Sequence, residues 1–391
     1  MSAISISESL FGAIRGVPHT FESWIYWVLL IAASIYVIFF YTTPGKKLPT
    51  GECAKSEPTG WDFSVIKPHA MGSNWAETEE VPYRPFKEGP YFLSMGLKPL
   101  SAENWIELDK TYLDRLAYKR HLFSRERSET VQSLPGSEDA SYESLEMLVD
   151  FLPRRYPGMF EKTERGIINL VTGEDWDLRR ESKMWEEKKT HPLEVMGLLS
   201  TEDWVIMQKD PEGGDEYHLR AGAVCFPSGW RLAERIGHSL YRIHAGNVPQ
   251  YEPRIAKSMD RFFSKLKVTS PIQRFNHNLD ISYELFRTHS IGAESSEKLT
   301  IGNIYLRVER QTLKRLPRTQ ALLFGIRTYI TPVESITKDR DVARILKAQI
   351  EAYPEDMAGY KNKHLWGAVV VEHLDGIIQG FQDRDSLHAL Q

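Results

Sequence analysis

The sequence predicts an α+β domain: a mostly antiparallel sheet with helices that occur in separate groups along the chain. Two observations favour this class. Short apolar or alternating runs, which are typical of strands, occur in the middle of the chain and again near residues 301–330. Apolar residues recur at helical spacing before, between and after these runs. The 391 residues are enough for one large or two ordinary domains.

The overall charge excludes a general nucleic-acid-binding role. Acidic residues number 53 and basic residues 49, which gives a formal net charge of −4, and no long block of Lys and Arg interrupts the sequence. Two cysteines, Cys53 and Cys225, rule out a disulfide framework and lack the paired spacing of a zinc site. One disulfide between them and two separate thiols both remain open.

An apolar run near the N-terminus predicts a single-pass membrane anchor over residues 24–43. From Trp24 to Tyr41 only Ser34 is polar, and these eighteen residues would span about 27 Å as a helix, close to the hydrocarbon thickness of a bilayer. A cleaved signal peptide is the alternative. We favour the retained anchor, because the apolar run follows the mixed-charge segment 1–23 and not a basic region.

The anchor divides the chain into an N-terminal segment, a tether and one large domain. Residues 44–80, rich in Pro and Gly, are expected to be the tether, and residues 81–391 the domain. Lys46 and Lys47 follow the anchor directly and favour a cytoplasmic location for the domain.

Two helices are predicted before the first strands. The first covers 101–121, with Ser101 as its cap. The second covers 139–151, and Pro153 is expected to end it.

Strands and helices then alternate. Residues 203–208 and 217–227 are predicted strands separated by a Gly-containing turn. Residues 231–244 and 255–266 are predicted helices.

The C-terminal third contains the most informative pattern. Residues 301–309 and 321–330 are predicted strands that form a hairpin or lie near each other, and polar residues alternate with apolar ones on the first of them. One polar face is therefore expected, and a salt-bridged outer surface is the alternative to a functional one. Helices are predicted at 338–352 and 367–380.

Common catalytic motifs are absent from the sequence. It contains no glycine-rich phosphate loop, no H-E-x-x-H zinc motif and no G-x-S-x-G nucleophile turn. Ser228 lies in a Phe-Pro-Ser-Gly-Trp segment that lacks the first glycine of that turn, so we expect it to cap the following helix.

The histidines are the remaining candidates for functional residues. His238 and His244 lie on one predicted helix, but six residues correspond to about 600° of rotation, so they face different directions and cannot share a metal. His244 lies in an apolar setting at the helix end, where a neutral imidazole could bind a haem iron. The alternative is a core histidine bonded to backbone. His238 is expected at the surface, and His277 and His289 in loops.

Glu309 is the carboxylate that we consider the best candidate for acid–base chemistry. It lies on a predicted strand between Arg307 and Arg310, so an ion pair is one interpretation. If its side chain faces a closed apolar pocket instead, desolvation would fit it for taking a proton from a substrate.

The chain resembles the haem-dependent oxidative N-demethylase α-subunit-like family, especially its fungal members with an N-terminal membrane span. The order and spacing of several segments, which together cover roughly residues 80–350, carry the resemblance. These segments are Pro85-Phe86, Gly89–Leu97, Trp105–Asp109 with Tyr112, Thr172–Glu174, Cys225–Trp230, Ile243-His244 with Val248-Pro249 and Tyr251, Met259–Phe263, Glu309–Leu313 and Leu316–Arg318.

The resemblance implies a PAS-like fold that binds haem b through one histidine and oxidises a small amine or secondary-metabolite substrate with O2. It implies that His244 is the proximal ligand, that Glu309 is the catalytic acid or base, and that Tyr251 lines the pocket. Arg310 or Arg307 would hold a haem propionate or the bound oxygen species. No flavin or ferredoxin segment is visible, so a separate electron-donor reductase is expected as partner.

Two alternatives to an enzyme remain open at this point. One is a haem-binding sensor or interaction module without turnover, and the other is a haem-free structural domain. Thr319-Gln320 stands where family members often have Ser-Gly, so the substrate does not transfer with the resemblance.

Overall fold

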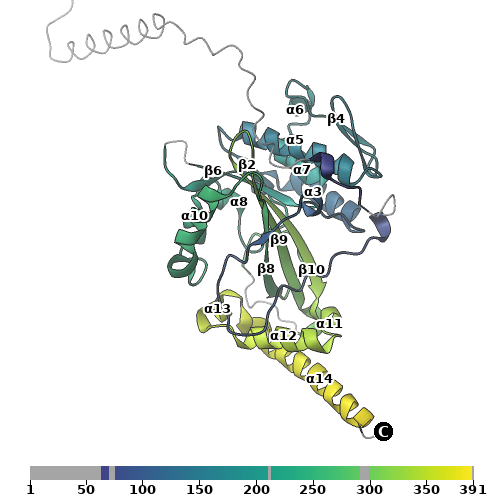
Figure 1. Cartoon of the computed structure of the whole chain (residues 1–391), viewed down its shortest axis with the longest axis vertical. Coiled ribbons are helices and arrows are strands. Elements are labelled where there is room, and N and C mark those ends of the chain that lie inside the picture. Colours follow the sequence, from purple (N-terminus) through teal and green to yellow (C-terminus); the bar gives the residue numbers. More distant parts are fainter. Residues whose placement is uncertain (1–62, 70–74, 210–212, 291–298, 390–391) are drawn as a thin grey trace, which may run out of the picture. The chain divides into compact units, whose positions relative to one another are not determined.

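The structure, a computed structural model, describes residues 63–69, 75–209, 213–290 and 299–389 (Figure 1). They lie in one compact unit, Glu57–Gln391. The predicted anchor at 24–43 lies outside the described residues, as do the N-terminal segment and most of the tether. Within the described part of the chain, no helix is both long and apolar enough to cross a membrane.

A seven-stranded, entirely antiparallel sheet forms the centre of this unit, as the sequence predicted. In spatial order its strands are β1 (Lys98–Pro99), β8 (Ile272–Asp280), β9 (Tyr305–Arg315), β10 (Leu322–Pro332), β6 (Asp203–Lys209), β7 (Tyr217–Ala223) and β2 (Val131–Ser133). A separate small sheet contains β3 (Phe160–Lys162), β4 (Gly166–Asn169) and β5 (Glu174–Asp177).

Strands β9 and β10 form the predicted hairpin. They pair without interruption from Tyr305 opposite Pro332 to Arg315 opposite Leu322. The predicted boundaries of the first strand were wrong at both ends. Residues Ile301–Asn303 form a single 3₁₀ turn, and β9 continues to Arg315, because its far end pairs on both sides with neighbouring strands.

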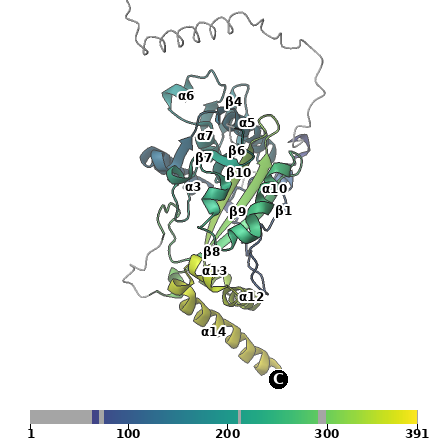
Figure 2. The same cartoon turned by 90° about the vertical axis from the view of Figure 1, so that its left-hand side faces the viewer.

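Helices cover both faces of the sheet and one of its ends. They are α3 (Tyr112–Arg125), α4 (Arg127–Thr130), α5 (Glu138–Arg155), α6 (Met184–Glu187), α7 (Pro192–Leu199), α8 (Leu232–Arg235), α9 (Leu240–His244), α10 (Lys257–Lys265), α11 (Val333–Ile336), α12 (Arg340–Glu351), α13 (Glu355–Tyr360) and α14 (Lys363–Ala389). Figures 1 and 2 show α12, α13 and α14 at one end of the long strands β8–β10.

The core has three parts that correspond to these groups. One face of the sheet packs on α3, α5 and α7 around Trp105 and Trp204. The opposite face packs on α9 and α10 around Met259 and Phe263. The third part joins the ends of β8–β10 to α12 and α14 around Trp366.

The first predicted helix begins later than expected. Ala102–Asn104 form only a 3₁₀ turn without a side-chain hydrogen bond from Ser101, and α3 starts at Tyr112. The carbonyl oxygens of Asn104 and Trp105 accept hydrogen bonds from the buried Arg310 guanidinium. Tertiary bonding therefore takes the carbonyl groups that a continuous helix would have used.

Other local predictions also need correction. Pro153 lies inside α5 and does not end it. The predicted helix 231–244 is two short helices, because the intervening Gly237 adopts a positive φ of 80°. Ser228 caps no helix. The residue before α8 is Arg231, and the Ser228 hydroxyl accepts a hydrogen bond from Arg287 at 3.0 Å.

Strand β8 was not predicted at all, and His277 lies on it and not in a loop. Only Phe275 and Leu279 give the middle of this strand an apolar signal, and His277 stands between them, so the alternation is too short to mark a strand. His238 is partly exposed, in agreement with the expected surface position. Cys225 is a buried free thiol, while Cys53 lies outside the described residues.

Candidate functional site: an amphiphilic cavity against the sheet

A cavity of about 630 Å³ lies between the sheet and the segments that follow β7. This volume falls within the roughly 300–1,000 Å³ that is usual for small-molecule and cofactor sites. Its wall includes residues from β6, β8, β9 and β10, from α8–α10, and from the turn between α13 and α14.

One half of the cavity is apolar. The strands contribute Val205, Met207, Leu219, Leu313, Leu322 and Phe324, and the helices contribute Leu240, Ile243, Met259, Phe262 and Phe263. Such a surface suits a flat hydrophobic group and excludes water from it.

The other half is polar, and the register of β8 and β9 builds it. Arg274 lies opposite Gln311, Asn276 opposite Glu309, and Asn278 opposite Arg307. Directly opposed residues of an antiparallel pair point to the same face. These six side chains therefore form one continuous patch on the cavity wall. The alternation seen in the sequence of β9 thus indicates a cavity wall and not a solvated surface.

His244 is the last residue of α9 and lines this cavity. Its Nδ1 donates a hydrogen bond to the carbonyl oxygen of Leu240 at 2.8 Å, which leaves Nε2 with no partner among the described residues. Burial lowers the pKa of His244, so the ring is neutral at physiological pH. A neutral imidazole whose Nδ1–H is bound to a carbonyl has the tautomer and the fixed ring of a metal ligand.

Tyr251 packs against the imidazole ring of His244. The two rings stack with centroids 5.1 Å apart and planes 20° apart. Tyr251 is 2% exposed and does not line the cavity. Burial raises the pKa of its hydroxyl to about 12. The structure therefore places Tyr251 in contact with His244, but not in the wall where the resemblance had placed it.

Glu309 faces the cavity and is not in an ion pair. Its Oε2 accepts hydrogen bonds from Gln311 Nε2 at 2.9 Å and from Asn276 Nδ2 at 3.4 Å. No Lys or Arg of the described chain comes within ion-pair distance of this carboxylate, and the side chain is partly exposed. It is therefore available to a ligand.

The two arginines that flank Glu309 are engaged elsewhere. Arg307 lines the cavity, but its guanidinium donates to the carbonyl oxygens of Phe226 at 2.7 Å and Glu284 at 3.2 Å. Arg310 points to the opposite face of the sheet, where it lies 3.4 Å from Glu107. Arg307 and Arg310 were the two candidates for binding a propionate or the bound oxygen species. Of these two, Arg310 does not reach the cavity.

Two other arginines, which the sequence did not single out, lie in the wall without a hydrogen-bond or ion-pair partner among the described residues. Arg235 ends α8 and Arg274 lies on β8. Among the described residues, neither guanidinium has a hydrogen-bond acceptor or a carboxylate at ion-pair distance, and burial lowers the pKa of both. The Arg235 guanidinium lies 4.7 Å from the ring centroid of Trp230. An Arg in a helix or strand carries no local signal of such a role.

Several buried polar atoms of the patch on β8 and β9 have no hydrogen-bond partner in the described chain. They are Arg274 Nε, Arg307 Nε, Asn278 Oδ1 and Gln311 Oε1. Buried polar groups are almost always paired in native proteins. These four atoms occupy neighbouring positions of one cavity wall and are available to a polar ligand or to water.

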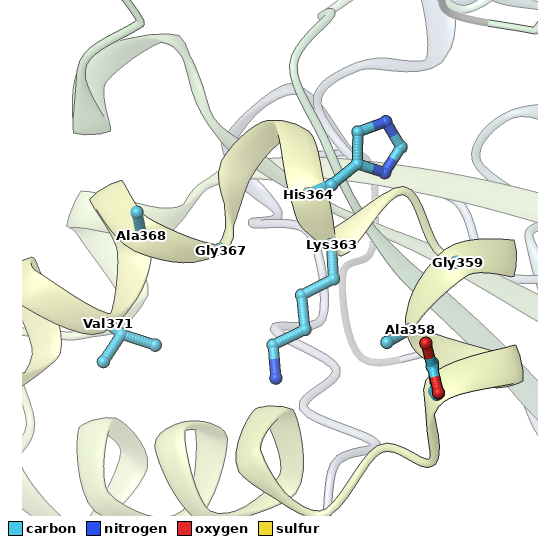
Figure 3. Close-up of a pocket in the computed structure, with 8 residues that line it drawn as sticks. Ala358, Gly359, Lys363, His364, Gly367, Ala368 and Val371 are labelled. Atoms are coloured by element: carbon cyan, nitrogen blue, oxygen red, sulfur yellow. The ribbon is translucent and has the colours of Figure 1, made fainter.

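A second concavity lies between α13 and α14 (Figure 3). Small residues such as Gly359, Gly367 and Ala368 form much of it. Lys363 reaches into this space, but its Nζ donates to the carbonyl oxygen of Ile350 at 2.8 Å. No comparable set of unpartnered groups gathers here, so the cavity against the sheet is the functional candidate.

Comparison with known families gives a match over most of the chain. The family model described as "Haem-dependent oxidative N-demethylase, alpha subunit-like" matches residues 96–371, well over half of the chain. The matched stretch contains every strand of both sheets and both sides of the cavity, including Arg235, His244, Arg274 and Glu309.

Proposed function

The chain belongs to the haem-dependent oxidative N-demethylase, alpha subunit-like family, and on this basis we propose that it is an oxidoreductase whose haem occupies the cavity against the sheet. The observation that carries the proposal is the setting of His244. It is a neutral histidine with a free Nε2, fixed by a backbone hydrogen bond, at a cavity that is apolar on one side and cationic on the other.

The residues of the cavity fit haem in three respects. His244 offers the one protein nitrogen that a proximal site needs. The apolar half suits the macrocycle. Arg235 and Arg274 are two unpaired guanidinium groups, and haem carries two propionates, which guanidinium binds in bidentate fashion. We propose that these two arginines, and not Arg310, hold the propionates. One histidine ligand would fit haem b.

The strand order supports the PAS-like fold that the resemblance implies. The five central strands lie in the order β7, β6, β10, β9, β8, which along the chain are the second, first, fifth, fourth and third of the five. Helices α8–α10 stand between β7 and β8 and cover the cavity face. We therefore infer a PAS-like core to which β1, β2 and the flanking helices are added.

The proposed reaction is the oxidative removal of a carbon substituent from the nitrogen of a small amine. Bound haem would supply the oxidising chemistry with O2. Glu309 would accept the proton of the substrate ammonium at Oε1, the carboxylate oxygen that its protein neighbours leave free, because only a neutral amine has a lone pair that can be oxidised. Asn276 and Gln311 hold the carboxylate for this task, and the apolar half keeps water away.

Two further parts of the proposal concern the surroundings of the domain. A separate reductase would deliver electrons. Residues 24–43 would anchor the chain in a membrane with the domain on the cytoplasmic side. Alkaline carbonate extraction of cell membranes tests the anchor: a chain that is released into the supernatant contradicts it.

The first experiment is a visible spectrum of the full-length protein reconstituted with haem, beside His244→Ala and His238→Ala. We expect a strong Soret band in the wild type, its loss or shift in His244→Ala, and no change in His238→Ala, because His238 does not line the cavity. Far-UV circular dichroism controls for folding. No Soret band in a folded wild type rejects the proposal, and an unchanged band in His244→Ala rejects the ligand. Turnover of N-methyl amines with an electron donor then separates an enzyme from a sensor.

A further inference from the structure

We propose that the substrate of this cavity is an amine that carries its own carboxylate, such as an N-methylated amino acid. Its nitrogen faces Glu309 and its carboxylate faces Lys361. The inference rests on the proposed function, because it assumes that haem occupies the same cavity. It follows from the charges in the wall, from the position of Lys361 and from the unpartnered acceptors beside Glu309.

The charges in the cavity wall do not balance. Two of them are neutralised by partners: Asp203 lies 3.3 Å from Lys119, and Arg287 lies 2.5 Å from Asp280. Among the described residues of the wall, four cations then stand against one carboxylate, Glu309. These cations are Arg235, Arg274, Arg307 and Lys361. His277 adds no charge at neutral pH, because burial brings its pKa to about 3.

Haem would remove only part of this excess. Its two propionates would neutralise two of the four cations, and Glu309 would offset a third. One cation remains. A simple alkylammonium ion would add a second uncompensated positive charge in a partly dry space, where like charges repel strongly. A zwitterionic amino acid adds no net charge and carries a carboxylate for the remaining cation.

Lys361 is the cation best placed for this carboxylate. It follows α13 and is 7% exposed, and its Nζ donates to the carbonyl oxygen of His277 at 2.6 Å. An ammonium group has three donors, so further N–H groups remain for a ligand. No carboxylate of the described chain lies within ion-pair distance of Nζ. Burial lowers the pKa of Lys361 to about 8, and the nearby Glu309 charge opposes this shift. Lys361 is therefore still largely protonated at pH 7.

The nitrogen end of the substrate meets acceptors. Glu309 accepts hydrogen bonds only at Oε2 from its protein neighbours. Beside it, Gln311 Oε1 and Asn278 Oδ1 are buried acceptors with no donor among the described residues. A protonated secondary amine brings two N–H donors. Acceptors on β8 and β9 and the Lys361 cation on the α13–α14 turn thus line the same cavity, where they can receive the two ends of an amino acid.

The test is a calorimetric titration of the haem-loaded, full-length protein with three ligands: N-methylglycine, its methyl ester and dimethylamine. The ester keeps the methylated nitrogen but has no carboxylate charge, so it is the matched comparison. We expect N-methylglycine to bind at least about tenfold more tightly than the ester and than dimethylamine, which corresponds to one charge-assisted contact.

Variants then assign the preference to Lys361. Lys361→Met should abolish the tenfold difference and bind the cationic ester at least as tightly as the wild type does, because the repelling charge is gone. Lys361→Arg should retain the difference. Lys363→Met, two residues away in the other concavity, is the matched control and should behave as the wild type.

The possible outcomes separate the inference, the role of Lys361 and the proposed function from one another. Equal Kd values for N-methylglycine and its ester in the wild type overturn the inference, and this comparison requires no variant to fold. A preference that survives Lys361→Met, or loss of the Soret band in that variant, overturns the role of Lys361. Absence of a Soret band in the wild type defeats the proposed function and the inference with it. A normal Soret band without a carboxylate preference defeats the inference alone.

Discussion

Single residues of this protein owe their charge states to burial. Glu202 precedes β6 and is 1% exposed, and neither of its carboxylate oxygens has a hydrogen-bond partner among the described residues. Burial raises its pKa, because the ionised form loses its hydration. Arg327 and Lys119 oppose that shift without cancelling it. The neutral acid is therefore favoured in the folded state more than in the unfolded state.

This predicts that Glu202→Gln stabilises the protein, with a pH-dependent gain. A raised folded-state pKa means that the wild type loses stability as pH rises from the ordinary carboxyl value to the raised one, because the unfolded chain releases the proton first. The gain from the amide should grow through that window by up to about 1.4 kcal/mol per pH unit.

Urea unfolding at a series of pH values from 4 to 8 measures the effect. Glu164→Gln, a change of an exposed carboxylate, serves as the control and should show no such trend. A gain from Glu202→Gln that is constant with pH, or that shrinks as pH rises, contradicts the assignment.

At the level of elements, one face of the β9–β10 hairpin lines the cavity and the other packs in the core. Arg307, Glu309 and Gln311 line the cavity, while Arg310 and Thr312 face the core around Trp105. A shift by one residue in the pairing would exchange the two faces and remove the site. Close packing on the core side fixes this register.

Gly325 on β10 is a test of that packing. A Cβ atom at this position would lie 2.8 Å from Thr312 Oγ1 and 2.9 Å from Trp204 Cζ3. Both neighbours are buried, so they have little room to move. We predict that Gly325→Ala lowers the free energy of unfolding by about 1–3 kcal/mol.

The matched control is Gly376→Ala on α14, where a Cβ atom would meet nothing within 4 Å. That change should be neutral or stabilise the helix by up to about 1 kcal/mol. Chemical denaturation of the two variants gives the comparison, and a Gly325→Ala protein as stable as wild type would show that the Trp204 contact is not tight.

At the scale of the whole molecule, the cavity joins three distant parts of the chain. Arg235 and His244 come from the segment after β7, Arg274 and Glu309 from the sheet, and Lys361 from the turn between the last helices. A ligand that contacts all of them binds only the folded state and should stabilise it.

We therefore predict that haem raises the melting temperature of the wild type and not that of His244→Ala. At a free haem concentration about 100 times Kd, the expected gain is about 2.7 kcal/mol. Differential scanning calorimetry with and without haem measures it, and His238→Ala should respond as wild type. An equal rise in His244→Ala would indicate nonspecific haem binding.

Local patterns were enough to predict some of these features. The alternation along β9, the hairpin with β10 and the strands β6 and β7 follow from periodicity, which depends only on neighbours in sequence. The choice of His244 depended on a helix end in an apolar setting, and the resemblance to the family is confirmed over residues 96–371. The roles of His244 and Glu309 remain predictions.

Other features required the tertiary structure. Strand β8 turns a polar face toward the cavity. On its other face His277, which bonds to Gln349 at 2.9 Å, stands between the core residues Phe275 and Leu279, so the apolar alternation is too short to mark the strand. Arg310 and Arg307 look equivalent in the sequence, yet the pleat sends them to opposite faces.

The sequence by itself determined the class of the sheet, the hairpin that bears Glu309 and the family. Only the tertiary structure decided which cations face the cavity. Arg235, Arg274 and Lys361 are far apart along the chain and carry no local signal, because a charged side chain obeys the same propensities whether it meets solvent, a partner or a ligand. Packing of distant segments assigns those surroundings, and with them the chemistry of the site.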